Sequence, residues 1–324
     1  MFKKIVATCV ALCALSTAAF AGKVFVSGQE AKELLAQDKT YQVFEVSWGT
    51  EKDSPDYLTG HIPGAVHFNT DYVEEGPLWN LLPFDRMVEN FKAMGVTKDS
   101  KILAYGHNVG VTRVVFAMLW AGVQEVKIID GGLEAWKAAG GELETTSNAP
   151  QPVADFGLTE PAHPEHVLSL AQVKEKLDTD KDFQLVSIRA KAEYVGETSG
   201  YTYIPKAGEP KGAIWGHAGS DSLHMEDYLH DDGTYINIDE LRALWADRDI
   251  STEKEISLYC GTGWRACIPW LILYENGIES TLFDGGWNEW QMNDDLPVQL
   301  GDPTQGDVQI VTVGDLSPDK AVKN

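Results

Sequence analysis

Cysteine is scarce in this chain, and half of it stands close to the N-terminus. The 324 residues contain four cysteines, Cys9, Cys13, Cys260 and Cys267. Small exported proteins that depend on disulfides for stability carry a much higher density of cysteine. The sequence therefore predicts a fold that is held by a hydrophobic core rather than by cross-links.

Long hydrophobic runs are missing as well, except at the N-terminus. There, Lys3 and Lys4 precede an apolar stretch over residues 5–15, and Ala19-Phe20-Ala21 follows it. This order is typical of a secretory signal peptide, and the stretch is too short to span a membrane. We expect residues 1–21 to be removed, together with the first two cysteines, so that 303 residues (324 − 21) remain. The sequence thus predicts a periplasmic or secreted protein with no membrane span.

Basic residues are few relative to acidic ones. The chain has 26 lysines and arginines against 49 aspartates and glutamates, a formal net charge of −23 that becomes −25 (−23 − 2) without Lys3 and Lys4. Such a surface repels nucleic acid and anionic membranes, so neither is expected as a partner. It also repels an anionic substrate at long range, so that such a substrate needs a local focus of positive charge.

The strongest functional signal is Cys260, which stands between two apolar segments. Residues 255–259 are typical of a short buried strand, and apolar residues at helical spacing follow Arg265 as far as Gly277, a plausible helix terminator. A thiol at such a strand-to-helix turn faces backbone N–H groups and the positive end of the helix dipole, which favour the thiolate. Arg265 adds a positive charge. We therefore interpret Cys260 as a catalytic nucleophile rather than a buried structural cysteine.

An internal repeat divides the chain into two similar units. In both units a tyrosine, Tyr105 or Tyr259, ends a strand-like run and stands 25 residues before an aspartate. That aspartate, Asp130 or Asp284, begins an Asp-Gly-Gly element with a tryptophan six residues after it. Short strands alternate with helical runs in both units. This pattern indicates the α/β class, with two domains that each contain a parallel sheet flanked by helices.

The composition places the domain boundaries. Residues 146–164 are polar and rich in proline, as linkers are. We expect a first domain over residues 22–145, a second over residues 165–300, and a C-terminal tail over residues 301–324. Residues 308–313 in the tail are expected to add an edge strand.

The two copies differ at the positions that matter for chemistry. Aligning their loops residue by residue sets Gly106 opposite Cys260 and Val111 opposite Arg265. The first copy therefore lacks both the nucleophile and the charge. We expect the second domain to be catalytic and the first to be inactive and to shape the site.

Gly60-His61-Ile62-Pro63-Gly64-Ala65 and the two Asp-Gly-Gly-x-x-x-Trp elements resemble tandem rhodanese domains, the sulfurtransferase family. The resemblance covers nearly the whole mature chain and implies an inactive first domain and an active second one. It implies a cysteine that takes a sulfane sulfur from a small anionic donor, forms a persulfide, and passes the sulfur to a thiophilic acceptor. A redox or sulfur-carrier protein is a further partner that it allows. It implies no cofactor and no metal ion.

The resemblance also assigns residues. Cys260 matches the persulfide-forming cysteine, Arg189 an arginine that helps to bind the anionic donor, and Trp48 an aromatic that the first domain offers to a shared cleft. The loop around the cysteine is matched by Gly261, Thr262, Gly263, Trp264 and Arg265. Two departures stand out: Ser187 replaces an acidic residue, and Glu209-Pro210-Lys211 replaces the second His-Ile-Pro. We interpret both as structural.

The length of the loop separates two chemistries. Phosphatases and arsenate reductases of related architecture place five residues between cysteine and arginine, whereas four separate Cys260 from Arg265. The shorter loop suits one transferable sulfur better than a tetrahedral oxyanion, so we favour sulfur transfer over phosphate, arsenate or selenite chemistry. A sulfur-binding or partner-docking module without turnover is a third hypothesis. Arg265 favours thiosulfate over mercaptopyruvate, because its guanidinium can meet two anionic oxygens.

Other candidates give weaker signals. We interpret Cys267 as a buried apolar residue, with a resolving thiol for Cys260 as the alternative. Three roles remain open for Trp264: a wall of the pocket, a contact with a partner, and simple packing. Residues 201–232 are expected to cover the cleft. Two further pairs have no convincing ligand spacing and are interpreted as exposed loop histidines rather than metal ligands: His163 with His166, and His224 with His230.

Overall fold

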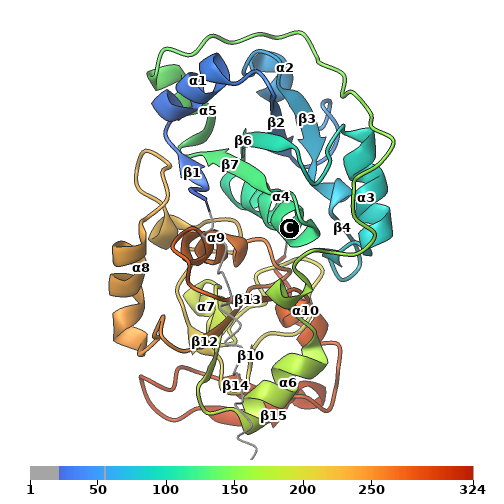
Figure 1. Ribbon diagram of the computed structural model, residues 1–324. Coiled ribbons are helices and arrows are strands. Elements are labelled where there is room, and N and C mark those ends of the chain that lie inside the picture. Colours follow the sequence, from blue (N-terminus) through green and yellow to red (C-terminus); the bar gives the residue numbers. More distant parts are fainter. Residues whose placement is uncertain (1–21, 55, 324) are drawn as a thin grey trace, which may run out of the picture.

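The computed structural model describes residues 22–54 and 56–323. The expected signal peptide, residues 1–21, lies outside the described residues. None of the helices in the described part of the chain has the length and apolar character needed to cross a membrane. The chain folds into two lobes of similar build, which Figure 1 shows one above the other.

The first domain contains a five-stranded parallel sheet in the order β1-β7-β6-β2-β3. Its strands are β1 (Phe25–Val26), β2 (Tyr41–Ser47), β3 (Val66–Asn69), β6 (Lys101–Gly106) and β7 (Glu125–Ile129). Its helices are α1 (Gly28–Gln37), α2 (Asp56–Thr59), α3 (Phe84–Ala93), α4 (Asn108–Ala121) and α5 (Gly132–Ala138), with a 3-10 turn at Thr70–Tyr72. Helices α1 and α5 pack on one face of the sheet, while α3 and α4 pack on the other.

The second domain repeats this plan with a parallel sheet in the order β11-β9-β12-β13-β8. Its strands are β8 (Val167–Leu168), β9 (Phe183–Ser187), β11 (Ile214–Trp215), β12 (Glu255–Tyr259) and β13 (Thr281–Phe283). Its helices are α6 (Leu170–Thr179), α7 (Lys191–Tyr194), α8 (Ile238–Trp245), α9 (Cys267–Glu275) and α10 (Gly286–Trp290), with 3-10 turns at Pro164–His166, Glu226–Tyr228 and Ala246–Arg248. The predicted pair of parallel sheets flanked by helices is confirmed.

Local sequence signals explain where the helices begin and end. A capping box starts α1, where Ser27 and Glu30 each bind the other's backbone N–H, and Ser169 and Gln172 do the same for α6. Helix α9 ends just before Gly277, which takes a left-handed backbone with φ of 68°. The predicted strand, helix and terminator around Cys260 are therefore confirmed.

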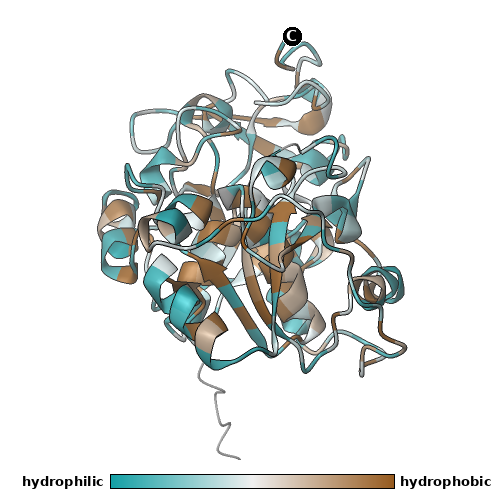
Figure 2. Cartoon of the chain, turned by 90° about the horizontal axis from the view of Figure 1, so that it is seen from above, coloured by the Kyte–Doolittle hydropathy of each residue, from teal (hydrophilic) through white to brown (hydrophobic). Residues whose placement is uncertain are grey.

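One hydrophobic core runs through both domains. It contains residues from α4 and from α9, whose packing places these two helices side by side at the domain junction (Figure 1). The rings of Phe116 and Trp270 meet there edge to face, with 4.6 Å between centroids. Figure 2 shows the hydrophobic residues concentrated in the central strands and helices. The domains thus share a core instead of merely sharing a linker.

Two small sheets complete the molecule. A hairpin of β4 (Glu74–Glu75) and β5 (Asn80–Leu81) belongs to the first domain. In the second domain, β10 (Glu209–Pro210), β14 (Pro297–Leu300) and β15 (Gln309–Thr312) form an antiparallel sheet, followed by a 3-10 turn at Val313–Asp315. Strand β15 lies at its edge, as predicted for residues 308–313. The tail then runs on beside residues 199–205, where the Ser199 N–H donates to the Lys320 carbonyl oxygen at 2.9 Å.

Candidate active site

Cys260 begins a loop, residues 260–266, between the central strand β12 and helix α9. Helix α10 holds this loop, because the N–H groups of Trp287 and Asn288 donate to the carbonyl oxygens of Cys260 and Gly261 at 2.9 and 3.0 Å. The close approach requires glycine at Gly286, where a Cβ would lie 2.5 Å from the Cys260 oxygen. Within residues 22–54 and 56–323, no hydrogen-bond acceptor meets the N–H groups of residues 261–265. The loop that begins at the thiol therefore contains five backbone donors that the described residues leave unpaired.

The Cys260 side chain is a free thiol and is fully buried. Tyr201 lies directly against the loop, since a Cβ at Gly261 would come within 2.3 Å of the Tyr201 hydroxyl oxygen. Ser222 fixes the same region by donating to the Gly200 carbonyl oxygen at 2.6 Å. Residues from the segment 201–232 thus lie over the loop. Because the thiol has no exposed surface, a substrate can reach it only when some of this cover moves.

Cys267, the other cysteine, opens helix α9. Its thiol donates to the carbonyl oxygen of Gly263 at 3.2 Å, and burial raises its pKa far above the ordinary value. Both features keep it protonated and make it a poor nucleophile. This surrounding suits the interpretation of Cys267 as a buried apolar residue.

Arg265 is buried and is engaged by a carboxylate. Its two terminal nitrogens lie 2.7 and 2.9 Å from the two oxygens of Glu193, and Nη2 also meets the Tyr201 hydroxyl at 3.0 Å. Burial opposes ionisation of Glu193, but Arg265 and Arg189 outweigh it and hold the pKa of Glu193 below its ordinary value. The Nε of Arg265 is buried without a partner. Most of the positive charge expected to focus an anion is therefore compensated internally.

Arg189 is fully buried in a second pair. Its Nη1 lies 2.7 Å from Glu209, and its Nε lies 3.3 Å from Glu193. Glu209 also accepts from Ser187 at 3.1 Å and from the hydroxyl of Tyr259. Burial raises the pKa of Glu209 to about 8, against the pull of Arg189. The two departures from the family pattern thus compensate each other. Ser187 has no carboxylate to offer Arg189, and Glu209 supplies one instead.

Trp264 points toward the first domain. Its Nε1 donates to Glu74 in β4, and its ring packs on the shared core. Glu74 also accepts from Arg113 of α4 at 2.9 Å, and Arg113 reaches Asp284 at 2.6 Å. Burial raises the pKa of Glu74 to about 7, although Arg113 and Trp264 lower it. Trp264 is thus part of a buried polar network that joins the domains.

The first domain presents a different tryptophan near the loop from the one expected. Trp48 is 59% exposed, and none of the contacts described for it involves residues 260–266. Trp79, in the β4–β5 hairpin, lies with its ring centroid 6.3 Å from that of Tyr203 in the second domain. The Thr262 side chain lies close enough to the Tyr203 hydroxyl to lower its pKa, against the raising effect of burial. Gly76-Pro77 is a turn signal that could have indicated this hairpin, but no sequence pattern indicates the contact with Tyr203.

Comparison with known proteins follows the same division into two domains. The rhodanese-like domain family matches the chain twice, at residues 27–139 and at residues 169–293. The chain is 40% identical over 278 residues to thiosulfate sulfurtransferase YnjE of Escherichia coli K12, and this match covers 85% of the chain and 63% of YnjE. It is 28% identical over 250 residues to the 3-mercaptopyruvate sulfurtransferase of E. coli K12, covering 75% of the chain and 85% of that protein.

Solved structures agree. The crystal structure of YnjE superposes with a TM-score of 0.81 at 37% identity, covering 86% of this chain and 68% of that one. Structures of EanB reach the same TM-score at 30% identity, over 86% of this chain and 71% of that one, and include a cysteine persulfide with ergothioneine. EanB structures also carry changes at a tyrosine 59 residues before that cysteine and at a threonine two residues after it. Here Tyr201 and Thr262 stand at these distances from Cys260.

Proposed function

The chain belongs to the rhodanese family, and from that premise we propose that it is a sulfurtransferase that carries a sulfane sulfur on Cys260 as a persulfide. The observation that supports this most is the loop itself. A thiol at the end of the central strand is followed by five N–H groups for which the described residues supply no acceptor, an arrangement that stabilises a thiolate and then a persulfide anion.

The proposed donor is thiosulfate or a related sulfane compound. The Cys260 thiolate attacks the outer sulfur of thiosulfate, the sulfur–sulfur bond to the sulfonate breaks, and its electron pair leaves on sulfite. The enzyme then holds a persulfide with one negative charge. A thiophilic acceptor such as a thiolate attacks the outer sulfur of that persulfide, and the Cys260 thiolate is regenerated.

Arg265 and Arg189 enter this proposal in a modified role. Glu193 and Glu209 occupy most of their donors, so we propose that the backbone N–H groups contact the anion first. The unpartnered Nε of Arg265 is the remaining contact that this arginine can offer. We expect Arg265→Ala to raise the thiosulfate KM and to lower kcat, because the change also leaves Glu193 as a buried, less compensated charge.

The decisive experiment is mass spectrometry of the purified chain after incubation with thiosulfate. We expect one added sulfur on the peptide that contains Cys260, and no such addition and no turnover in Cys260→Ser. Cys267→Ser is the matched control, since it removes the other thiol of the same loop region, and it should keep most of the activity. Full sulfur transfer by Cys260→Ser would rule the proposal out, and an equal loss in Cys267→Ser would favour the resolving-thiol alternative.

A second candidate concerns the acceptor. EanB is described with hercynine and with ergothioneine, the trimethylammonium derivative of histidine and its sulfur-bearing form. The tyrosine and threonine spacing shared with EanB supports an acceptor of this kind here, where Tyr201 meets Arg265 and Thr262 meets Tyr203. Sulfur would pass from the persulfide to a ring carbon, a C–H bond becoming C–SH while Cys260 returns to the thiol.

This candidate has its own test. The chain is first loaded with sulfur from polysulfide and then incubated with hercynine, and ergothioneine is measured by liquid chromatography and mass spectrometry. Ergothioneine formation that is lost in Cys260→Ser would support the second candidate. Persulfide that passes to cyanide or to thiols but never to hercynine would leave the first proposal standing alone.

A further inference from the structure

The β4–β5 hairpin of the first domain is anchored on the second domain beside the Cys260 loop. The Leu81 N–H donates to Asp284 at 2.6 Å, and the Asn288 side-chain amide donates to the Pro77 carbonyl oxygen at 3.1 Å. Arg113, which itself binds Asp284, donates to the Trp79 carbonyl oxygen at 3.1 Å. Both ends of the hairpin and its tip are therefore tied to the junction.

At that tip, Trp79 has a backbone that bulky residues avoid. Its φ is +62°, in the left-handed region where a non-glycine residue is held only by its surroundings. The anchors of the hairpin supply this restraint, and they direct the Trp79 ring to Tyr203, 6.3 Å away between centroids. The left-handed conformation is energetically unfavourable for tryptophan. Its presence at Trp79, where it places the ring at the domain junction, indicates that the ring has a function there.

Three rings make a row that ends at the catalytic loop, and we call Trp79, Tyr203 and Tyr201 the aromatic row. The Tyr203 ring lies 5.4 Å from that of Tyr201, and Tyr201 lies against Gly261. Tyr203 is 49% exposed, so the row offers ring faces to a ligand while its inner end reaches the loop. One of the three rings comes from the first domain.

The charges around the row select a cationic ligand. The chain carries a formal net charge of −23, and Arg265, the arginine of the Cys260 loop, is paired with the carboxylate of Glu193. Aromatic faces in such a field attract methylated ammonium groups, which bind by cation–π contact. We propose that the aromatic row binds a methylated ammonium group of the sulfur acceptor, so that the first domain sets acceptor specificity through Trp79. The inference rests on the proposed sulfur transfer at Cys260.

Binding to the Cys260→Ser protein tests this without any turnover. Hercynine and histidine are titrated by calorimetry into this protein, and hercynine should bind more tightly. Adding Trp79→Ala should weaken hercynine binding roughly 2- to 30-fold, and Trp79→Phe should restore much of it. Trp48→Ala, another first-domain tryptophan, is the matched control and should change nothing.

The outcomes separate the two proposals. Equal affinity for hercynine and histidine, or unchanged hercynine binding in a Trp79→Ala protein with a normal melting temperature, would overturn the aromatic row. A Trp79→Ala protein that melts early is replaced in the test by Tyr203→Leu, which lies outside the anchored hairpin and should weaken binding similarly. Wild-type protein that never acquires the extra sulfur would overturn the proposed function, while the binding result would stand.

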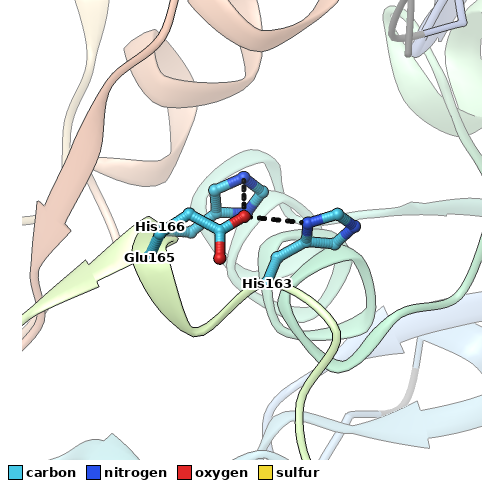
Figure 3. Close-up of side chains that lie close together, drawn as sticks. All are labelled: His163, Glu165 and His166. Atoms are coloured by element: carbon cyan, nitrogen blue, oxygen red, sulfur yellow. Dashed lines mark hydrogen bonds and ion pairs between the residues drawn. The ribbon is translucent and has the colours of Figure 1, made fainter. Parts of the chain in front are cut away.

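A different observation carries a second inference, at the end of the linker. His163, Glu165 and His166 point toward one another, as Figure 3 shows, and their ligand atoms all lie within 4.8 Å. Oε1 of Glu165 is 3.0 Å from Nδ1 of His163 and 3.9 Å from Nε2 of His166. The linker holds the group in place, because the His163 N–H donates to the Trp120 carbonyl oxygen at 3.2 Å and the His166 ring packs on Trp270.

The geometry of the group also suits a cation. Two imidazole nitrogens and one carboxylate oxygen that lie within 4.8 Å of one another can each offer a lone pair to the same ion. Nδ1 of His166 is buried and has no hydrogen-bond partner among the described residues. We infer that His163, Glu165 and His166 form a site for a divalent metal of the zinc type, with water completing the coordination. The sequence-based interpretation of both histidines as exposed loop residues fails for His166, which is only partly exposed.

Equilibrium dialysis of the metal-free chain against micromolar Zn²⁺, with metal analysis, tests the site. We expect one bound Zn²⁺ per chain, at least tenfold weaker binding in His163→Gln and Glu165→Gln, and a Co²⁺ absorption spectrum typical of nitrogen and oxygen ligands. His230→Gln is the matched control, because His230 pairs with Glu240 at 3.1 Å without a third ligand nearby among the described residues. Absence of binding, or equal binding in the two variants, would overturn the inference.

Discussion

The loops after β6 and β12 occupy the same place in the two domains, but only the second has room for a side chain. Strand β6 continues to Gly106, which pairs with Val46, and a Cβ at Gly106 would lie 2.0 Å from the Val46 carbonyl oxygen. Strand β12 ends one residue earlier in the alignment, at Tyr259, and leaves Cys260 outside the ladder. The two positions therefore differ in backbone course as well as in residue type.

The two copies also differ at the position five residues after Gly106 and Cys260. Val111 is buried in the core that α4 shares with α9, whereas its counterpart Arg265 is paired with Glu193 on the other side of the junction. In the first copy these two positions serve core packing and sheet pairing. This suits the predicted role of the first domain, which is to support the second.

The largest expected effect comes from removing the first domain altogether. Residues 165–324 expressed alone should be insoluble or inactive, because α9 would lose α4 and expose a helix that is buried from Cys267 to Leu273. Solubility, circular dichroism and sulfur transfer measure this. A fragment that folds and transfers sulfur at the full rate would show that the shared core is dispensable.

A single change at the junction should have a smaller but clear effect. Arg113→Ala leaves Glu74 and Asp284 as buried carboxylates without their partner. Breaking such a buried pair costs about 3–5 kcal/mol of unfolding free energy. Arg86→Ala removes an exposed pair with Glu75 and should cost far less, because exposed ion pairs contribute little to stability. Urea unfolding of both variants measures the difference, and similar values would mean that the network does not join the domains.

Restoring a cysteine to the first copy should not restore chemistry. In Gly106→Cys the new Cβ collides with the Val46 backbone, so the sheet must shift at a cost of roughly 1–3 kcal/mol. We expect a lower melting temperature and no added sulfur at position 106 when Cys260→Ser is present. A persulfide at position 106 would mean that residue type alone separates the two copies.

The smallest effect is on the pH dependence of stability. Burial raises the pKa of Glu74 to about 7 and that of Glu209 to about 8. Both folded-state values lie above the unfolded value of 4.5, so the folded chain binds more protons in this range. The contribution of these groups to unfolding free energy is therefore full below pH 4.5 and lost as pH rises to about 8.

Urea unfolding between pH 5 and pH 8 measures this slope. Glu209 has the higher of the two folded-state pKa values. Glu209→Gln should therefore flatten the pH dependence in the upper part of the range and leave the part below pH 7 to Glu74. A slope unchanged by Glu209→Gln would show that Arg189 keeps this carboxylate ionised throughout.

Patterns that repeat along the chain could be predicted from the sequence, whereas pairings between distant segments could not. The strand before Cys260, the helix after it and the terminator at Gly277 follow from periodicity and local backbone preference. The pairing of Arg265 with Glu193 joins residues 72 apart, and no local signal distinguishes such an arginine from a free one. Trp79 was missed for the same reason, since its place depends on a hairpin anchored to Asp284, 203 residues beyond Leu81.

The domain junction has one more property, which concerns the symmetry of its contacts. Phe116 and Trp270 are each ten residues beyond their loop positions, Gly106 and Cys260, and they meet each other. Leu81 and Tyr235 are each 25 residues before those positions, and each gives its N–H to the opposite aspartate, Asp284 or Asp130. Counterparts that contact each other and exchange equal bonds are typical of a two-fold dimer interface. The junction between the two domains therefore has, within one polypeptide, the contact pattern of a two-fold dimer.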